Sequence, residues 1–279
     1  MEWNSLTAAV RARLSGLHDA EARVAHVVLD QGAQLVHLSV SDVARLAGTS
    51  ASTVVRSCRK LGFRGYQELK ITAAREAPPG PHDEDDPLTA TIRTAQEALG
   101  GLPATLSRAH LNDAAQALND AGRVLVAATG LSGAVAADAA YRLRALGLAA
   151  DLPPDPLTAH LAAELLPEQS VCLAISHSGA TRSTVETARR ARAAGAAIVT
   201  ITSYASSPLA EESTWVLVGG GQDLVLGMEA VASRLAHLTI VDTLSMMLLA
   251  LGGDRAERAV AASADVTAGH SYLRGRPSP

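Results

Sequence analysis

The sequence predicts two domains of different fold class: an all-α domain, followed by an α/β domain in which helices flank a parallel sheet. Up to residue 77 apolar side chains recur at helical spacing, whereas beyond residue 105 apolar, β-rich runs alternate with helix-length segments. Between the two patterns lies PPGPHDEDDP, residues 78–87, whose four prolines and four acids oppose regular structure. We therefore place the domain boundary at about residue 77.

The composition is that of a folded protein. The chain has 279 residues, of which 48% are hydrophobic and 19% charged, too apolar for a disordered protein. Its two cysteines, Cys58 and Cys172, cannot form a disulfide framework or a cysteine-rich zinc site. No apolar stretch free of charges and helix breakers is long enough for a membrane span, and the N-terminus lacks a signal-peptide core. We expect a cytoplasmic protein without membrane contact.

The net charge of −4 conceals an asymmetry between the two domains. Residues 1–77 carry ten basic and seven acidic side chains, whereas the rest of the chain carries fourteen basic and twenty-one acidic ones. Residues 45–75 contain seven basic side chains and a single acidic one, Glu68. Because Lys and Arg supply most of the affinity for nucleic-acid phosphates, the N-terminal domain is the candidate for binding nucleic acid.

The N-terminal domain contains the pattern of two short helices joined by a tight turn. An amphipathic helix runs from Glu21 and includes an apolar stripe that extends to Leu35. In the following SVSDVARLAGTSASTVVRSCRKLGF, Ser41 is expected to cap one helix and Ser50 the next, with Gly48 permitting the turn between them. This arrangement is a helix-turn-helix.

The second of these helices has the chemistry of a DNA-reading element. Its first exposed positions are small and polar and are able to approach bases or phosphates, and cations follow along the same helix. The candidate DNA contacts are Ser50, Ser52, Thr53, Arg56, Arg59 and Lys60. An ordinary helical hairpin with a solvated basic face remains the alternative. We expect Phe63 and Tyr66, which follow this helix, to pack a further helix onto the bundle, and Cys58 to be a small buried residue.

The segment LSVSDVARLAGTSASTVVRSCRKLGFRGYQELK closely resembles the N-terminal domain of RpiR-type transcriptional regulators. The pattern of that family is met by Ala in the first helix, Ser and Thr opening the second, Arg near its middle and a following Leu-Gly-aromatic segment. The matching residues are Ala44, Ser50, Thr53, Arg56, Leu61, Gly62, Phe63 and Tyr66. The resemblance covers about fifty residues and implies a DNA-binding domain.

The sequence of the C-terminal domain predicts a flavodoxin- or Rossmann-like parallel sheet. Its candidate strands are the apolar runs at residues 123–128, 170–175, 196–202 and 214–219. Ligands of open α/β sheets bind beyond the carboxyl ends of the strands. The loops that follow the first two strands therefore contain the candidate site.

These two loops are rich in glycine and hydroxyl groups. Ser132 lies near Gly130 and opens a helix after the first strand, and Ser176, Ser178 and Thr181 surround Gly179 after the second. Helix N-termini offer free N–H groups and a positive dipole end, so hydroxyls gathered there indicate a phosphate site. Each serine or threonine is alternatively a simple helix cap.

A dinucleotide fold is the competing interpretation of the first loop. Gly130 and Gly133 follow a strand and Asp151 lies about twenty residues on, as in the dinucleotide-binding fingerprint. Ala128 occupies the position of the first glycine, however, and the serine-rich second loop has no role in that motif.

Taken together, the two loops resemble the SIS (sugar isomerase) domain, whose second loop has the pattern S-x-S-G-x-T. SHSGAT at residues 176–181 meets this pattern, and the resemblance extends over residues 105–252. It implies a bound sugar phosphate, with the phosphate held by Ser132, Ser176, Ser178 and Thr181 around Gly179. Glu229, which opens the last long helix, is a further candidate ligand contact; alternatively it only favours the helix N-terminus.

Some SIS proteins are enzymes, so a catalytic base has to be considered. Isomerisation needs a general base beside a carbonyl. Many SIS sequences carry Glu before the loop threonine, where this chain has Ala180; His177 and Glu229 remain possible bases. The histidines show no metal-binding spacing. We expect no catalytic residue, no metal and no cofactor.

The sequence therefore predicts a helix-turn-helix domain at 1–77, a linker with a connecting helix at 78–104, an SIS domain at 105–252 and a C-terminal tail at 253–279. The expected function is a transcriptional regulator of carbohydrate metabolism that binds operator DNA and responds to a phosphorylated sugar. A homodimer or homotetramer is expected, because paired helix-turn-helix units match DNA half-sites, and the apolar helix at 229–251 could supply an interface. An SIS isomerase or lyase with an attached helical module is the alternative.

Overall fold

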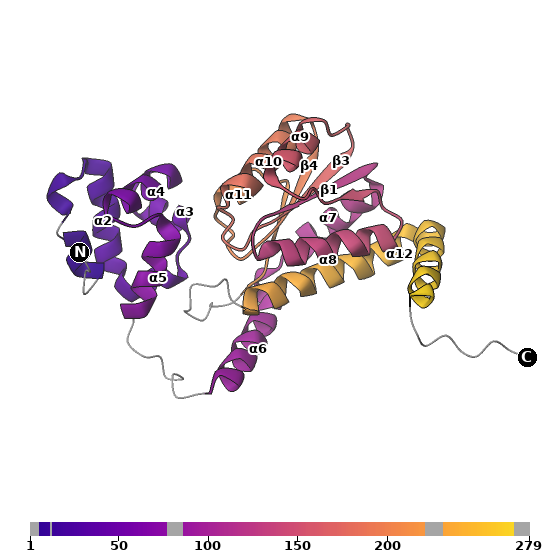
Figure 1. Cartoon of the computed structure of the whole chain (residues 1–279), viewed down its shortest axis with the longest axis horizontal. Coiled ribbons are helices and arrows are strands. Elements are labelled where there is room, and N and C mark those ends of the chain that lie inside the picture. Colours follow the sequence, from indigo (N-terminus) through magenta and orange to yellow (C-terminus); the bar gives the residue numbers. More distant parts are fainter. Residues whose placement is uncertain (1–5, 12, 77–85, 221–230, 271–279) are drawn as a thin grey trace, which may run out of the picture.

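The computed structural model describes residues 6–11, 13–76, 86–220 and 231–270, which form a helical N-terminal domain and an α/β C-terminal domain (Figure 1). Short helices make up the first domain, with two 3₁₀ turns at Leu14–Gly16 and Gly32–His37. Its helices are α1 (Leu6–Arg11), α2 (Asp19–Gln31), α3 (Val40–Leu46), α4 (Ala51–Lys60) and α5 (Tyr66–Glu76). The predicted helix-turn-helix corresponds to α3 and α4.

A single apolar cluster holds the N-terminal helices together. Cys58 is fully buried in it, and burial raises the pKa of its thiol to about 12, so the residue acts as a small apolar side chain. Phe63 packs against the same cluster, and Tyr66 is buried with its hydroxyl donating to the carbonyl of Leu38 at 2.9 Å. The predicted packing roles of Phe63, Tyr66 and Cys58 are confirmed.

Helix α3 begins two residues earlier than the sequence predicts. Ser39 is its N-cap: the hydroxyl accepts from the amide of Asp42, and the Asp42 carboxylate accepts from the amide of Ser39. Ser41 lies inside the helix, and its buried Oγ has no hydrogen-bond partner. The prediction that Ser41 caps this helix is therefore wrong, because the Ser39–Asp42 pair forms a reciprocal capping box. The prediction that Ser50 caps α4 is confirmed.

The C-terminal domain contains a five-stranded parallel sheet in the order β2-β1-β3-β4-β5. The strands are β1 (Arg123–Ala128), β2 (Ala150–Asp151), β3 (Ser170–Ile175), β4 (Ala197–Thr202) and β5 (Trp215–Val218). The helices are α6 (Pro87–Thr105), α7 (Arg108–Asp120), α8 (Ser132–Ala145), α9 (Pro156–Glu164), α10 (Arg182–Ala193), α11 (Pro208–Glu211) and α12 (Val231–Gly269). The predicted parallel sheet flanked by helices is confirmed.

Helices cover both faces of this sheet (Figure 1). Alternate residues of β1 enter different cores: Val124 and Val126 pack with α7, α8 and α12, whereas Leu125 and Ala127 pack with α9, α10 and α11. Helix α6 joins the first of these cores through Leu102. The strands are therefore buried on both sides, which explains why their sequences are continuous apolar runs.

Two C-terminal elements differ from the sequence prediction. Strand β2 was not predicted, because a strand of two residues leaves no periodicity. Helix α12 extends to Gly269 across a kink at Gly253, so residues 254–269, assigned to a tail, are helical. By length and composition alone, the helix over residues 232–269 is also long and apolar enough to cross a membrane, a test that the core helix of a folded domain passes as well. In the structure Ile240, Leu244 and Leu248 on this helix are buried in the domain core.

The cap of α3 provides a direct test of the helix boundary. Ser39→Ala should lower the free energy of unfolding by about 1 kcal/mol, because it removes the N-cap acceptor. Ser41→Ala is the matched control and should be neutral or slightly stabilising, because it removes a buried hydroxyl without a partner. Urea unfolding of both variants measures the difference. An equal or greater loss of unfolding free energy in Ser41→Ala would instead indicate that Ser41 caps the helix, as the sequence predicts.

Candidate functional site

The N-terminus of α4 presents small polar side chains. Ser50 caps the helix by accepting from the amide of Thr53 at 3.2 Å, and its Oγ lies 2.9 Å from the hydroxyls of both Ser52 and Thr53. Ser50 and Ser52 are exposed, whereas Thr53 is 8% exposed. Among the predicted DNA contacts, Ser50 and Ser52 are therefore open to a partner, and Thr53 supports the cap from within the domain.

The predicted cations lie along α4 above a buried carboxylate. Arg56, Arg59 and Lys60 are exposed. The buried Glu21 of α2 accepts from Lys60 Nζ at 2.9 Å, and its Oε1 lies 3.6 Å from Arg56 Nε. The hydrogen bond from Lys60 and that from the amide of His18 hold the pKa of Glu21 below its usual value. Glu21 therefore orients two of the three cations, a role that the sequence analysis missed.

In the C-terminal domain, the ends of β1 and β3 bring the two predicted loops together. Ala128 pairs with Ile175, so Thr129 and Ser176 leave adjacent strands at the same edge of the sheet. Thr129 Oγ1 lies 2.8 Å from Ser183 Oγ, which joins the first loop to α10. The strand order therefore places the two predicted loops next to each other.

The predicted ligand hydroxyls of the second loop surround the start of α10. Ser176 Oγ lies 3.1 Å from Thr181 Oγ1, and Ser178 Oγ accepts from the amide of Ala180 at 3.3 Å. Thr181 is the N-cap residue of α10, but its side chain makes no capping hydrogen bond. Because helix N-termini carry free N–H groups and a positive dipole end, this point favours an anion.

Gly179 gives the second loop its shape. Its φ of +59° lies in the left-handed region, and a Cβ placed there would lie 2.2 Å from the hydroxyl oxygen of Ser207. Its carbonyl accepts from the amide of Leu209 in α11 at 2.9 Å. Only glycine therefore satisfies both the backbone conformation and the close approach of Ser207.

The remaining predicted ligand residues occupy different environments. Ser132 is the first residue of α8 and is 5% exposed, and α8 also begins without a side-chain cap. Glu229 lies outside the described residues. The structure thus brings Ser176, Ser178, Gly179 and Thr181 together in one loop, with Ser132 at the start of the neighbouring helix.

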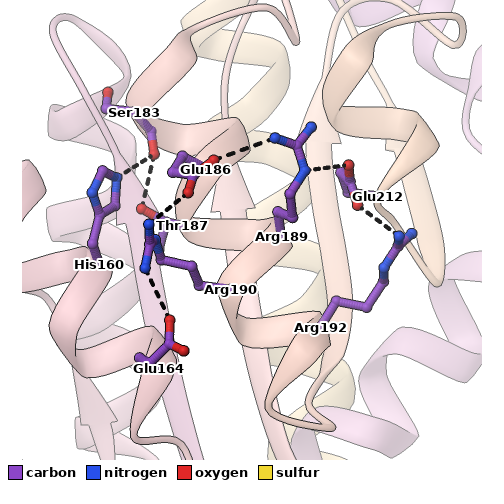
Figure 2. A network of polar contacts seen from close by, with 9 residues as sticks. All are labelled: His160, Glu164, Ser183, Glu186, Thr187, Arg189, Arg190, Arg192 and Glu212. Carbon is purple, nitrogen blue, oxygen red and sulfur yellow. Dashed lines mark hydrogen bonds and ion pairs between the residues drawn. The ribbon is translucent and has the colours of Figure 1, made fainter.

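Ion pairs hold α10 between α9 and α11, as Figure 2 shows. Glu212, whose side chain is 10% exposed, pairs with Arg189 and Arg192 at 3.0 Å, and Arg190 bridges Glu164 and Glu186. At the N-terminal end of α10, two groups contact the carbonyl of Ser183: a ring nitrogen of His160 at 3.2 Å and the hydroxyl of Thr187 at 2.9 Å. These contacts fix the helix end that the loop surrounds.

A cavity of about 350 Å³ opens beside this helix end. It is bounded by the first loop, by the prolines that precede α9 and by the first turns of α10, and its polar lining residues are Thr129, Asp155, Ser183, Thr184 and Thr187. The side chain of Thr184 is buried and its Oγ1 has no hydrogen-bond partner. Buried hydroxyls are normally paired, so this one is a candidate ligand contact.

The sequence pattern does not predict this cavity. Two of its lining residues, Thr129 and Ser183, directly adjoin the predicted loops. They could have been found by extending the two motifs by a few residues. Asp155 comes from the loop after β2, a strand too short to predict. The hydroxyl residues Ser132, Ser176, Ser178 and Thr181 do not line the cavity, which is connected to their loop through the Thr129–Ser183 hydrogen bond.

His177, considered above as a possible base, belongs to a largely buried polar network. Its Nδ1 lies 2.9 Å from Ser203 Oγ, which lies 3.1 Å from Nε2 of His237 and 3.0 Å from the carbonyl oxygen of Gly219. A serine hydroxyl has one hydrogen to donate. If Ser203 donates this hydrogen to the carbonyl of Gly219, Nδ1 of His177 and Nε2 of His237 must both donate to Ser203 Oγ. His177 Nδ1 then has a structural role.

The dinucleotide alternative finds no support in the placement of Asp151. Asp151 lies on the edge strand β2, and its carboxylate forms an ion pair with Arg123 on the neighbouring strand β1. Across the described ranges, no group of three His, Cys, Asp or Glu side chains is placed to hold a metal ion.

Comparison with known proteins identifies both domains. A family model for the rpiR-family helix-turn-helix domain matches residues 4–79, and one for the SIS domain matches residues 117–249. An HTH-type transcriptional regulator of Caldanaerobacter subterraneus is 31% identical over 86% of this chain and 89% of its own length. The chain belongs to the RpiR family of transcriptional regulators. The regulator HexR of Pseudomonas aeruginosa is 30% identical over 85% of this chain and 86% of its own.

A solved structure resembles this RpiR-family chain over nearly its whole length. The Vibrio vulnificus NanR protein complexed with ManNAc-6P matches with a TM-score of 0.82 at 25% identity, covering 96% of this chain and all of that one. The match includes both domains, so the two chains also place their domains similarly.

Glu21 gives this regulator a pH-dependent contribution to stability. Because its pKa is lowered in the folded state, the contribution is complete above the unfolded pKa and is lost as the pH falls through the folded one. Glu21→Gln should therefore lower the thermal unfolding midpoint at pH 7, and the difference from wild type should vanish in acid. Glu97→Gln, at an exposed carboxylate 3.9 Å from Arg93 Nε, is the control and should have little effect. If Glu21→Gln lowers the unfolding midpoint by the same amount at every pH, the ionised Glu21 carboxylate is not the source of the stabilisation.

Thr184 and Thr187 offer a matched pair for testing the cavity. Both are buried, but Thr187 Oγ1 donates to a carbonyl whereas Thr184 Oγ1 has no partner. Thr184→Val should keep or raise the free energy of unfolding and weaken sugar-phosphate binding about tenfold, if its hydroxyl binds the ligand. Thr187→Val should instead lower the free energy of unfolding by about 1 kcal/mol. Calorimetric titration and urea unfolding measure both quantities. Unchanged ligand affinity in Thr184→Val would remove this hydroxyl from the site.

Proposed function

We propose that this chain is a cytoplasmic, DNA-binding transcriptional regulator of carbohydrate metabolism whose operator affinity changes when a phosphorylated sugar binds the SIS domain. The single observation that carries the ligand assignment is the hydroxyl-rich loop around the uncapped start of α10, next to a cavity of about 350 Å³. A pocket of this size suits a small polar metabolite. The likeness to NanR, a relative complexed with a sugar phosphate, supports the same ligand class.

The proposed DNA contacts are Ser50, the N-cap of α4, and Ser52, Arg56, Arg59 and Lys60 of α4, with the buried Thr53 supporting the cap. The helix N-terminus would enter the major groove and the cations would contact the backbone. Since operators present two half-sites, the working unit is a homodimer or homotetramer. The proposed effector contacts are Ser132, Ser176, Ser178, Gly179, Thr181 and Glu229, with Thr184 added from the cavity.

We propose that the chain has no enzymatic activity. The loop position before Thr181, where many SIS sequences carry Glu, is Ala180, and His177 Nδ1 is committed to Ser203. Regulation then requires a difference in effector affinity between DNA-competent and DNA-incompetent arrangements, which shifts their populations.

The function is tested by measuring DNA binding and turnover side by side. An operator is selected from a pool of random duplexes, and its binding is followed by fluorescence anisotropy with a panel of hexose and amino-sugar phosphates. Conversion of each sugar phosphate is followed by NMR. The proposal expects one of them to change operator affinity without being converted. Turnover with no effect on DNA binding would instead identify an isomerase or lyase.

Two variants should separate the two binding activities. Arg56→Ala should weaken operator binding about tenfold and leave sugar-phosphate affinity unchanged, and if Arg56 contacts a phosphate the salt slope falls by about one. Ser178→Ala should weaken sugar-phosphate binding about tenfold and leave effector-free DNA binding unchanged. Arg258→Ala, at an exposed position of α12, controls for the loss of one positive charge. Loss of both activities in either variant would contradict this division.

A further inference from the structure

The DNA-binding domain touches the SIS domain beside the effector loop. Ser39 Oγ, at the cap of α3, lies 3.0 Å from the carbonyl oxygen of Ser206, and Lys70 Nζ of α5 donates to the hydroxyl of Tyr204 at 2.9 Å. Ala180, in the effector loop itself, packs against the apolar cluster of the N-terminal domain. Two of these three contacts fall on residues 203–207, which we call the β4–α11 segment.

The β4–α11 segment is also bound tightly to the effector loop. At its start, the amide of Ser203 donates to the carbonyl of His177 at 3.0 Å. At its end, Ser207 fills the space beside Gly179 so closely that no Cβ would fit there. The ring of Tyr204 meets that of His177 edge-on, with centroids 5.6 Å apart. The effector loop therefore cannot change shape without displacing this segment.

On the other side, the segment contacts the cap of the first helix of the helix-turn-helix. Ser39 has one hydroxyl hydrogen and two acceptors within reach, Asp42 Oδ2 at 2.7 Å and the carbonyl of Ser206 at 3.0 Å. The same hydroxyl thus serves both the capping box of α3 and the interdomain contact. Lys70 adds a second attachment through α5, which packs against α4.

We propose that the β4–α11 segment is the coupling element of this regulator: sugar phosphate bound at residues 176–181 favours the domain arrangement in which Ser39 and Lys70 contact this segment. The proposal rests on the proposed function and specifies how that site is regulated. The likeness to NanR with ManNAc-6P over both domains supports it, because this docked arrangement is similar to that of a relative holding a sugar phosphate. Effector and operator then affect each other through the docking equilibrium, by the same factor in both directions.

Tyr204→Phe is the sharpest test, because it keeps the ring against His177 and removes the hydroxyl that accepts from Lys70. Tyr141→Phe, at an exposed tyrosine of α8, is the matched control. The readout is the ratio of operator dissociation constants with and without the sugar phosphate that acts on wild type. If that ratio lies in the usual range for allosteric proteins, about 5- to 150-fold, Tyr204→Phe should bring it several-fold closer to one, and the control should not.

Lys70→Met removes the same hydrogen bond from the other side. Lys70 carries a charge that could also affect DNA binding, so the ratio, rather than the affinity itself, is compared, and it should likewise approach one. Wild-type ratios in both Tyr204→Phe and Lys70→Met would overturn the coupling while leaving the proposed function intact. If no sugar phosphate changes operator binding of wild type, the proposed function fails instead.

Hydrogen-exchange mass spectrometry decides the docking without an operator. Amide exchange is followed in peptides covering residues 38–47 and 203–209. The probes are the sugar phosphates of the panel and inorganic phosphate. Slower exchange of both peptides in wild type, lost in Tyr204→Phe and kept in Tyr141→Phe, supports the coupling. The coupling is overturned if no probe slows exchange in residues 38–47 of wild type, or if both Tyr204→Phe and Lys70→Met keep the full effect.

Discussion

The pairing of β1 with β3 at the centre of the sheet is the constraint on which the proposed effector site depends. Strand β2 lies on the other side of β1, so the winding of the chain reverses between β1 and β3. Helices α8 and α10 consequently cover opposite faces of the sheet, and a crevice opens at the carboxyl ends of the two strands. Thr129 and Ser176 leave paired positions at this point, so the two loops meet whatever their exact sequences.

The proposed anion sites of the two domains rely on different physical means. The C-terminal domain carries a net negative charge, and no lysine occurs beyond Lys70; its loop offers hydroxyls and the uncapped N-terminus of α10, oriented by Gly179 and by the ion pairs of Glu212. The N-terminal domain instead concentrates side-chain charge on α4, and the buried Glu21 orients part of it. A fixed loop suits one small anion, whereas exposed cations spread along a helix suit an extended phosphate backbone.

The sequence was informative where local chemistry decides the structure. Four of the five strands, the cap at Ser50 and the loop at residues 176–181 follow from apolar runs, capping residues and glycine positions. The cap of α3 was misplaced because Ser39 and Ser41 are equally good local candidates, and only the pairing with Asp42 distinguishes them. Glu21 and the cavity beside Thr184 depend on contacts between distant segments, which spacing along one chain does not encode.

The contacts described between the domains suit switching because they include single polar contacts. The Ser39 hydroxyl and Lys70 contact the β4–α11 segment, and Ala180 of the effector loop packs against the apolar cluster of the N-terminal domain. Interdomain contacts of this kind leave two arrangements within a few kcal/mol of each other. An anion bound at the start of α10 needs to favour one arrangement only modestly to redistribute them. A large apolar interface at this position would fix one arrangement and leave the effector nothing to change.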